Sequence, residues 1–311
     1  MSVLKMKEEP VMRIAISSAL AASLLVGMGT PASAAVLCKS RSGVIVVREA
    51  CKKKEAPLDL SQFGAVGPAG LAAWERPCPP DAVLSGTTCI DKYEASVWRV
   101  PGALTTNAAL VAKIQQGTVT AADLAAGAAT ALGTASDNYA PCADNGQNCS
   151  NDIYAVSLQG VAPSANLTWF QAQVACKNAR KRLPSNEEWQ AAVAGTPDPG
   201  PDNGTTDCDS TGALSLTGSR SDCVSSDGAF DMVGNLYELV ADWIPRSFGC
   251  DTWSAGVSPT LDQQCLSAGG EPLALMRGGF SGNEVGLAGP LAVNVSVTSS
   301  SLSAVGFRCA R

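Results

Sequence analysis

Apolar and polar residues recur with different periods along the chain, and these periods predict its elements. Residues 44–47 (VIVV) form a short apolar run between two cysteines, which is typical of a strand in a small unit. Phe170, Val174 and Cys176 recur at roughly helical spacing and predict a helix. Residues 293–298 alternate apolar and polar side chains, so a half-exposed strand is expected there.

Polar residues mark helix starts in two places. After Pro184 the chain restarts with Ser185, which is placed to cap a helix whose third residue is Glu188. Residues 120–123 (TAAD) form a variant of the same capping box within an alanine-rich helical stretch. Between Trp189 and position 226, by contrast, Gly, Pro, Asp, Ser and Thr dominate, which predicts long ordered loops.

The N-terminus has the pattern of an export signal. An apolar run from Ile14 to Val26 precedes PASA at 31–34, so cleavage is expected after Ala34 and residues 1–34 are interpreted as a signal peptide. The run is too short to span a membrane comfortably, and we expect no transmembrane segment in the mature chain. The alternative is a buried helix at the start of the domain.

Twelve cysteines remain after such cleavage, an even number that favours disulfides in an exported protein. Spacing does not determine connectivity, but five local pairs suggest themselves, and a sixth would join the two cysteines left over. The local pairs are Cys38 with Cys51, Cys78 with Cys89, Cys142 with Cys149, Cys208 with Cys223, and Cys250 with Cys265; the remaining pair is Cys176 with Cys309.

Composition excludes several classes of function. The 311 residues are 46% apolar, enough for a full core, and the net charge of −6 argues against nucleic acid as a partner. The chain has no histidine, which excludes Ser-His-Asp and Cys-His catalysis and histidine-ligated zinc or iron.

Three motifs together resemble one known family. Residues 228–243 read GAFDMVGNLYELVADW, residues 277–280 read RGGF, and residues 305–309 read VGFRC. Two further blocks, PSANLTWFQAQVAC at 163–176 and KRLPSNEEW at 181–189, agree with them, as does CIDKYEAS at 89–96, which looks like the family's opening strand. This array resembles the formylglycine-generating enzyme (sulfatase-modifying factor) family.

The resemblance implies an α+β, C-type-lectin-like (sulfatase-modifying-factor) fold, disulfide-rich and with much irregular loop structure. It also implies a structural calcium ion bound by the side chains of Asp231 and Glu238 and the carbonyls of Gly234 and Leu236. The alternative to a calcium site is that both carboxylates accept hydrogen bonds from backbone amides of the turn. Lys181 and Arg182 are expected to be structural ion-pair partners; the alternative is that they contact a ligand.

The catalytic thiols of the family's aerobic enzyme are missing. Counting along the motif places Asn283 and Ala288 at their positions, and no cysteine lies between Cys265 and Cys309. Copper(I) prefers thiolate ligands, so a copper site and formylglycine synthesis are both unexpected. An oxidoreductase with a diverged site is the enzymatic alternative.

In C-type-lectin-like folds the segment after the diglycine lines the ligand surface. The residues expected to face a ligand are therefore Ser281, Asn283, Glu284, Asn294 and Ser296, with Tyr237 near the same cleft; the alternative is that they are ordinary solvent-facing positions. The arrangement is also similar to the variable proteins of diversity-generating retroelements, although the asparagine bias expected of those proteins is absent.

The domain organisation follows from these assignments. Residues 35–75 are expected to form a small Cys-bounded segment with a collagen-like Gly/Pro linker, and residues 76–311 the main domain, with an insertion at about 101–140. We predict an exported periplasmic, cell-surface or extracellular protein that binds a protein or small-molecule ligand without catalysis. A structural component of the cell envelope is the third possibility, because of the linker and the six possible disulfides.

Overall fold

The computed structural model describes residues 36–40, 45–48, 50–53, 55–57, 78–149, 152–198, 202–244, 251–252, 263–264, 270–282 and 287–311. It divides the chain into two compact units, residues 1–76 and 77–311. Several predictions from the sequence lie outside the described residues: the signal peptide at 1–34, the linker that ends at 75, the pair Cys250–Cys265, and Asn283 and Glu284.

The first unit contains a small antiparallel sheet. Its strands are β1 (Val36–Ser40), β2 (Ile45–Arg48) and β3 (Glu55–Pro57), in the order β2-β1-β3. The predicted strand at 44–47 is therefore confirmed with a shift of one residue. A disulfide between Cys38 and Cys51 closes the sheet, as the spacing suggested.

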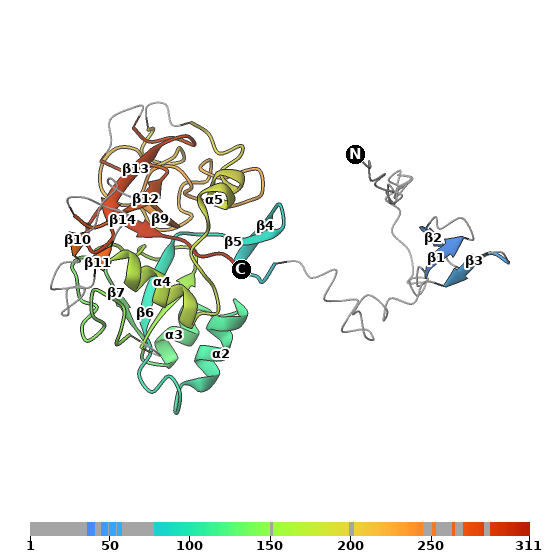
Figure 1. The fold of residues 1–311 in the computed structure, drawn as a ribbon, viewed down its shortest axis with the longest axis horizontal. Coiled ribbons are helices and arrows are strands. Elements are labelled where there is room, and N and C mark those ends of the chain that lie inside the picture. The colour runs from blue at the N-terminus through green and yellow to red at the C-terminus, as the bar shows by residue number, and fades with distance from the viewer. Residues whose placement is uncertain are drawn as a thin grey trace, which may run out of the picture. The chain divides into compact units, whose positions relative to one another are not determined.

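The main unit is built around a four-stranded sheet with the order β13-β12-β9-β14 (Figure 1). β12 (Leu273–Arg277) pairs antiparallel with β9 (Tyr237–Ile244) and β13 (Val293–Val297), and β14 (Val305–Phe307) runs parallel to β9. The predicted alternating strand is thus confirmed as β13. It lies at one edge of this sheet, opposite β14.

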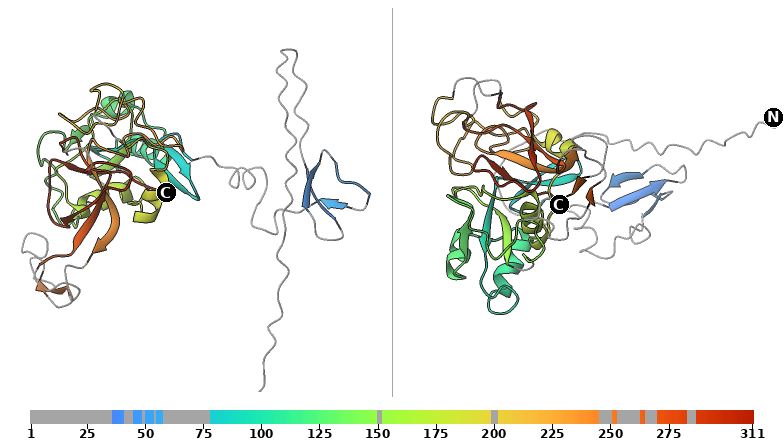
Figure 2. Two further views of the ribbon diagram at one scale, coloured as in Figure 1. Left: turned by 90° about the horizontal axis from the view of Figure 1, so that it is seen from above. Right: turned by 60° about the vertical axis from the view of Figure 1, so that its left-hand side comes forward.

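A second sheet has the order β7-β6-β8, with β6 at Ala95–Arg99, β7 at Thr130–Leu132 and β8 at Ile153–Ser157. The other described strands of the main unit form two antiparallel pairs: β4 (Ala82–Ser85) with β5 (Thr88–Asp91), and β10 (Asp251–Thr252) with β11 (Gln263–Gln264). Figure 2 shows the second sheet and its helices as a green region beside the red and orange four-stranded sheet.

The resemblance at 89–96 predicted one opening strand, and that prediction is wrong in detail. The segment divides into β5 and β6, with a bend at residues 92–94. The bend places Glu94 in the core, where its carboxylate accepts hydrogen bonds from Asn235 and from the backbone of Leu236. The strand is interrupted because this buried carboxylate has its donors on another segment.

Among the described residues four helices cover the sheets, and two of them begin where the sequence predicted. α3 (Ala121–Ala126) and α5 (Asn186–Ala192) begin at the predicted capping boxes of Thr120 and Ser185. α2 (Ala108–Gln116) and α3 occupy the alanine-rich stretch assigned to an insertion. α4 (Trp169–Asn178) is the predicted central helix, and a third capping box, between Thr168 and Gln171, begins it.

The main core joins α4 to both sheets. Ala172, Ala175 and Cys176 of α4 are fully buried among side chains of β8, β9 and β12. A second apolar cluster surrounds Trp189, and a third packs α2 and α3 against β8. Between α5 and β9 the described chain is mostly turn and bend, which confirms the long loops expected after Trp189.

Five disulfides cross-link the described part of the chain, and all five were predicted. Four are local, and Cys176–Cys309 ties α4 to the segment after β14 across a separation of 133 residues. No described cysteine is free. Disulfides of this number indicate an oxidising compartment. No helix in the described part of the chain is long and apolar enough to cross a membrane.

Candidate functional site

The turn from Asp231 to Glu238 lies at the centre of a buried polar network. Asp231, Gly234 and Asn235 all have positive φ, which folds the segment into a tight turn ahead of β9. Asp231 accepts a hydrogen bond from the backbone N–H of Gly218 at 2.6 Å. Both carboxylates of the turn, Asp231 and Glu238, are at least 98% buried.

Glu238 is held by a cation and an indole. Its Oε2 accepts a hydrogen bond from Trp189 Nε1 at 2.6 Å, and Arg308 Nε lies 2.7 Å from the same oxygen and 2.9 Å from Oε1. Arg308 is fully buried and donates further to the carbonyls of Asp91 and Phe230. This guanidinium therefore joins β9, the end of β5 and the C-terminal segment.

Asn235 connects the turn to two other loops. Its Oδ1 accepts a hydrogen bond from the backbone N–H of Ser215, and its Nδ2 donates to Glu94. Its backbone N–H donates to the carbonyl of Asp209. A Cβ on the neighbouring Gly234 would come within 2.1 Å of that carbonyl oxygen, so the loops approach each other here at backbone contact distance.

Negative charge exceeds positive charge in this network. Burial, together with Asp231 and Glu238, raises the pKa of Glu94 well above its ordinary value. Burial raises the pKa of Asp231 to about 7, although the Gly218 amide and Arg308 oppose that rise. Asp209, which interacts with Asp231, pairs with Arg220, and its Oδ1 is buried without a hydrogen-bond donor in the described chain.

The calcium site at Asp231, Gly234, Leu236 and Glu238 stays a prediction, and both of its carboxylates already have protein partners. Calcium takes six to eight oxygen ligands, usually with carboxylates among them. Glu238 uses both of its oxygens on Arg308 and Trp189, and no group of three or more acidic, Cys or His side chains in the described residues is arranged to hold a metal. Arg308 thus places a positive charge directly beside Glu238.

The loop that follows β12 is tightly packed. Arg277 is 3% exposed, stacks on Trp189 and donates a hydrogen bond to Gln190. Gly279 has φ +84°, and a Cβ there would lie 2.4 Å from Cα of Ala288. Ala288 itself is 3% exposed, so a position expected to replace a catalytic thiol is filled by a buried methyl group.

Two of the predicted ligand residues meet at the edge of the sheet. Asn294 Nδ2 on β13 donates to the hydroxyl of Tyr237 at 3.2 Å, and the Tyr237 ring lies 5.5 Å from that of Phe280. Asn294 is exposed and Ser296 is half-buried, whereas Tyr237 is 7% exposed. Ser281 is buried and donates its backbone N–H to the carbonyl of Asn235, so it belongs to the scaffold.

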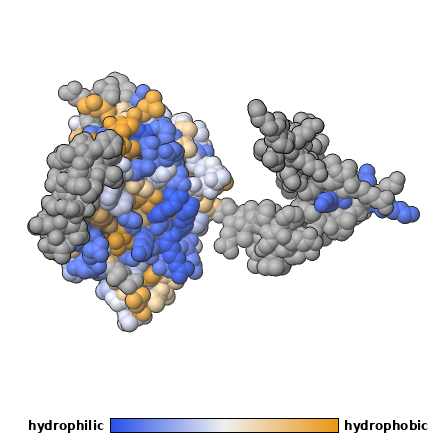
Figure 3. Space-filling model, in the orientation of Figure 1, coloured by the Kyte–Doolittle hydropathy of each residue, from blue (hydrophilic) through white to orange (hydrophobic). Residues whose placement is uncertain are grey.

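Apolar side chains are exposed on the same strand and just before it. Val293 and Val295 are 55% and 38% exposed, and Leu291 is 79% exposed. Next to them a hollow of about 410 Å³ is lined by Asp198 and residues 288–292. In the view of Figure 3 hydrophobic residues interrupt a mostly hydrophilic face of the main unit.

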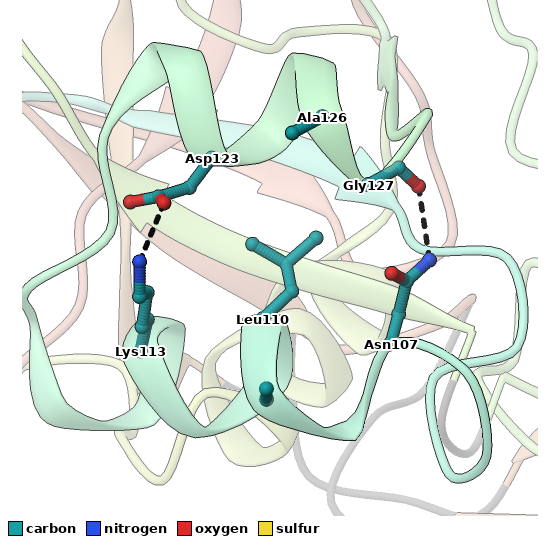
Figure 4. Close-up of a pocket in the computed structure, with 7 residues that line it drawn as sticks. Asn107, Leu110, Lys113, Asp123, Ala126 and Gly127 are labelled. Atoms are coloured by element: carbon teal, nitrogen blue, oxygen red, sulfur yellow. Dashed lines mark hydrogen bonds and ion pairs between the residues drawn. The ribbon is translucent and has the colours of Figure 1, made fainter.

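Two other hollows lie away from this edge. One, of about 490 Å³, lies between α4 and the loop closed by Cys142–Cys149. The other, of about 210 Å³, lies between α2 and α3 (Figure 4). In Figure 4 the Lys113–Asp123 ion pair and the hydrogen bond from Asn107 to Gly127 border it, and Leu110 points between the two helices. Because these polar groups already pair with each other, we do not assign a ligand to that hollow.

Residues 106–311, about two thirds of the chain, match the family model of the sulfatase-modifying factor enzyme 1-like domain. The chain belongs to this family. The α+β, C-type-lectin-like fold expected from the sequence is confirmed, together with its loops and disulfides. No curated protein matches the chain in sequence.

Solved structures resemble the chain weakly. The major tropism determinant P3c variant is 17% identical, covers 76% of this chain and 54% of its own, and superposes with a TM-score of 0.45. PvdO from Pseudomonas aeruginosa is 22% identical over 48% of this chain and 61% of its own, with a TM-score of 0.30. Variable protein 1 from Treponema denticola is 17% identical over 48% of this chain and 70% of its own, with a TM-score of 0.30. This chain therefore spans about half the length of the first of these structures.

Within this sulfatase-modifying-factor domain, several network residues were not identified as site residues from the sequence. Glu94, Asn235 and Arg308 all lie inside motifs that carried the resemblance, but nothing in those motifs shows that they meet. Lys181 and Arg182 were correctly interpreted as ion-pair partners: Lys181 contacts Asp81 and Asp91, and Arg182 contacts Glu188.

Proposed function

We propose that this sulfatase-modifying-factor domain is a non-catalytic binding module that docks a protein partner in an extracytoplasmic compartment. Its docking surface comprises β13 and the residues just before it, with Leu291, Val293, Asn294, Val295 and Ser296 in contact with the partner. The observation that carries the proposal is the packing of Ala288 against Gly279, which leaves a buried methyl group where family enzymes need a thiol.

The absence of thiol chemistry in the described chain supports a binding role. Each of its ten cysteines is in a disulfide, so the described residues supply neither a thiolate for copper(I) nor a redox-active pair. A different chemistry on the same scaffold is the enzymatic alternative. Detectable turnover of any substrate without added thiol or copper would favour it.

The properties of β13 support a protein partner over a small molecule. Small ligands usually bind in concave sites that bury most of their surface. β13 instead presents exposed valines beside Asn294 at the edge of a sheet, and exposed apolar residues that lie together commonly mark contact surfaces. Because Tyr237 holds the Asn294 amide, this polar group is positioned before a partner arrives.

The test is selection of binders to the purified chain from displayed libraries of linear peptides and folded domains. The selected binders are then measured against Asn294→Lys and against Gln116→Lys, which adds the same charge to an exposed position on α2. We expect Asn294→Lys to weaken binding at least about tenfold, because it places an unpaired charge in the contact. Equal binding to both variants would place the docking surface elsewhere.

A structural role in the cell envelope is a separate candidate, favoured by the number of disulfides. Fractionation of producing cells distinguishes the two roles. A freely secreted chain supports the binding module, whereas a chain retained in detergent-insoluble envelope material supports the structural role.

A further inference from the structure

A lysine and two aspartates meet in a buried cluster on the side of the domain formed by the β4–β5 hairpin. Lys181 Nζ lies 2.5 Å from Asp81 Oδ2 and 2.6 Å from Asp91 Oδ1. The side chains of Lys181, Asp81 and Asp91 are 0%, 6% and 1% exposed. The amine and the two carboxyl groups are therefore in contact and shielded from water.

The backbone holds all three residues in place. Asp81 and Asp91 flank the β4–β5 hairpin, in which Ala82 pairs with Asp91. The backbone N–H of Lys181 donates to the carbonyl of Cys176 at the end of α4. The second oxygen of Asp91 accepts the backbone N–H of Cys309 at 3.2 Å. Groups held at such distances react as if at very high local concentration.

Two fully ionised partners are costly in this environment, because burial removes the hydration of both charges. Burial is the main cause that raises the pKa of Asp91 to about 6, although Lys181 opposes it. An amide bond forms between a neutral amine and a neutral carboxylic acid, and the raised pKa of Asp91 favours the acid form of its side chain.

We propose that Lys181 and Asp91 form an intramolecular isopeptide bond in the folded protein. Lys181 Nζ, as the neutral amine, attacks Cγ of the protonated Asp91 carboxyl group, and the new N–C bond replaces one C–O bond. The hydroxyl leaves with a proton from nitrogen as one water molecule. No oxidant, metal or second reactant is needed, since condensation of an acid with an amine changes no oxidation state.

Asp81 is placed to act as the proton carrier. Its Oδ2 contacts the attacking nitrogen, so it can accept a proton from that nitrogen and return it to the departing hydroxyl. Its Oδ1 accepts a hydrogen bond from Arg311 at 3.1 Å. After condensation, Asp81 and Arg311 remain as an ion pair and the charges of Lys181 and Asp91 are gone. The product therefore leaves no unpaired charge in the cluster.

Mass spectrometry tests the bond directly. The full chain is purified, reduced, alkylated and weighed under denaturing conditions, with its N-terminus sequenced so that the expected mass is known. We expect the wild type to be lighter by one water molecule, and proteolysis to yield one branched peptide that joins the segments around Lys181 and Asp91. A wild-type chain of full mass after prolonged incubation at neutral pH overturns the proposal.

Two variants assign the chemistry. Lys181→Arg keeps the positive charge but lacks a nucleophilic amine, so it should have full mass after allowance for the substitution. Asp81→Asn should keep the pair in place and slow the loss of water at least about tenfold in a time course after refolding. A water loss that persists in Lys181→Arg overturns the assignment to Lys181, and unchanged kinetics in Asp81→Asn overturn the role of Asp81. Circular dichroism confirms that each variant is folded.

Discussion

Arg308 and Glu238 form an ion pair in the interior of the domain, with Nε 2.7 Å from Oε2 and both side chains at most 1% exposed. Arg308 comes from the segment after β14 and Glu238 from β9, 70 residues apart. Their contact joins the C-terminal motif of the family to the turn that precedes β9. Arg308 thus neutralises one of the two carboxylates that the resemblance assigned to a calcium ion.

Removing one charge of this pair should strongly lower the stability of the domain. Glu238→Gln leaves the Arg308 guanidinium buried without its main carboxylate, and we expect a loss of about 3–5 kcal/mol in the free energy of unfolding. Urea titration measures it. Lys113→Ala, which breaks the exposed Lys113–Asp123 pair, is the matched control and should lose only a small fraction of that amount. Equal losses in both variants would show that burial of the pair is not decisive.

The contact between Gly279 and Ala288 should not tolerate a side chain. Gly279→Ala adds a methyl group 2.4 Å from a backbone atom at a position with φ +84°, and we expect a loss of about 3 kcal/mol or more. Gly160→Ala is the control, because Gly160 has φ +74° with no atom within 4 Å of the added methyl group. That variant should lose only about 1–2 kcal/mol, from backbone strain alone. The difference between their thermal midpoints reports the steric part.

Stability should have its maximum at mildly acidic pH. Burial raises the pKa of Asp91 to about 6, above its ordinary value of 3.8, so the folded state binds this proton first and gains stability as pH falls from about 7 to 4. The Arg182 hydrogen bond lowers the pKa of Glu188 from 4.5 to about 2, and the stability from that contact is lost as pH falls from 4.5 to 2.

Denaturation midpoints measured from pH 8 to pH 2 test both signs. Glu188→Gln should lessen the loss below pH 4.5, and Asp91→Ala should lessen the gain between pH 7 and pH 4. If condensation with Lys181 is complete, the Asp91 carboxyl no longer titrates, and the wild type should already lack the gain that this carboxyl would provide. Mass spectrometry of the same sample separates these two cases.

Chelation should leave the domain intact. Because Arg308 already neutralises Glu238, we expect treatment with a calcium chelator to leave the thermal midpoint unchanged within the error of the measurement. Elemental analysis of the purified chain measures its calcium content. A copper(I) challenge should give no copper uptake, and a thiol titration in denaturant should find no free thiol. One tightly bound calcium per chain and a lowered midpoint after chelation would restore the four-ligand site predicted from the sequence.

The sequence by itself determined the local features of this protein. The capping boxes at Thr120 and Ser185, the alternation in β13 and the four local disulfides depend on residues close together in the chain, so spacing and side-chain chemistry suffice to predict them. The family motifs extended this to the fold. Cys176–Cys309 was predicted because only these two cysteines remained after local pairing.

Only the tertiary structure decided which polar groups meet. Glu94, Asn235 and Arg308 come from three separate motifs, and Lys181 lies 90 residues from Asp91. Nothing in the spacing of such residues states which carboxylate receives which cation, because that choice depends on how the sheets and loops pack. Ser281 shows the same limit, since its place on a predicted ligand segment did not reveal that packing buries it.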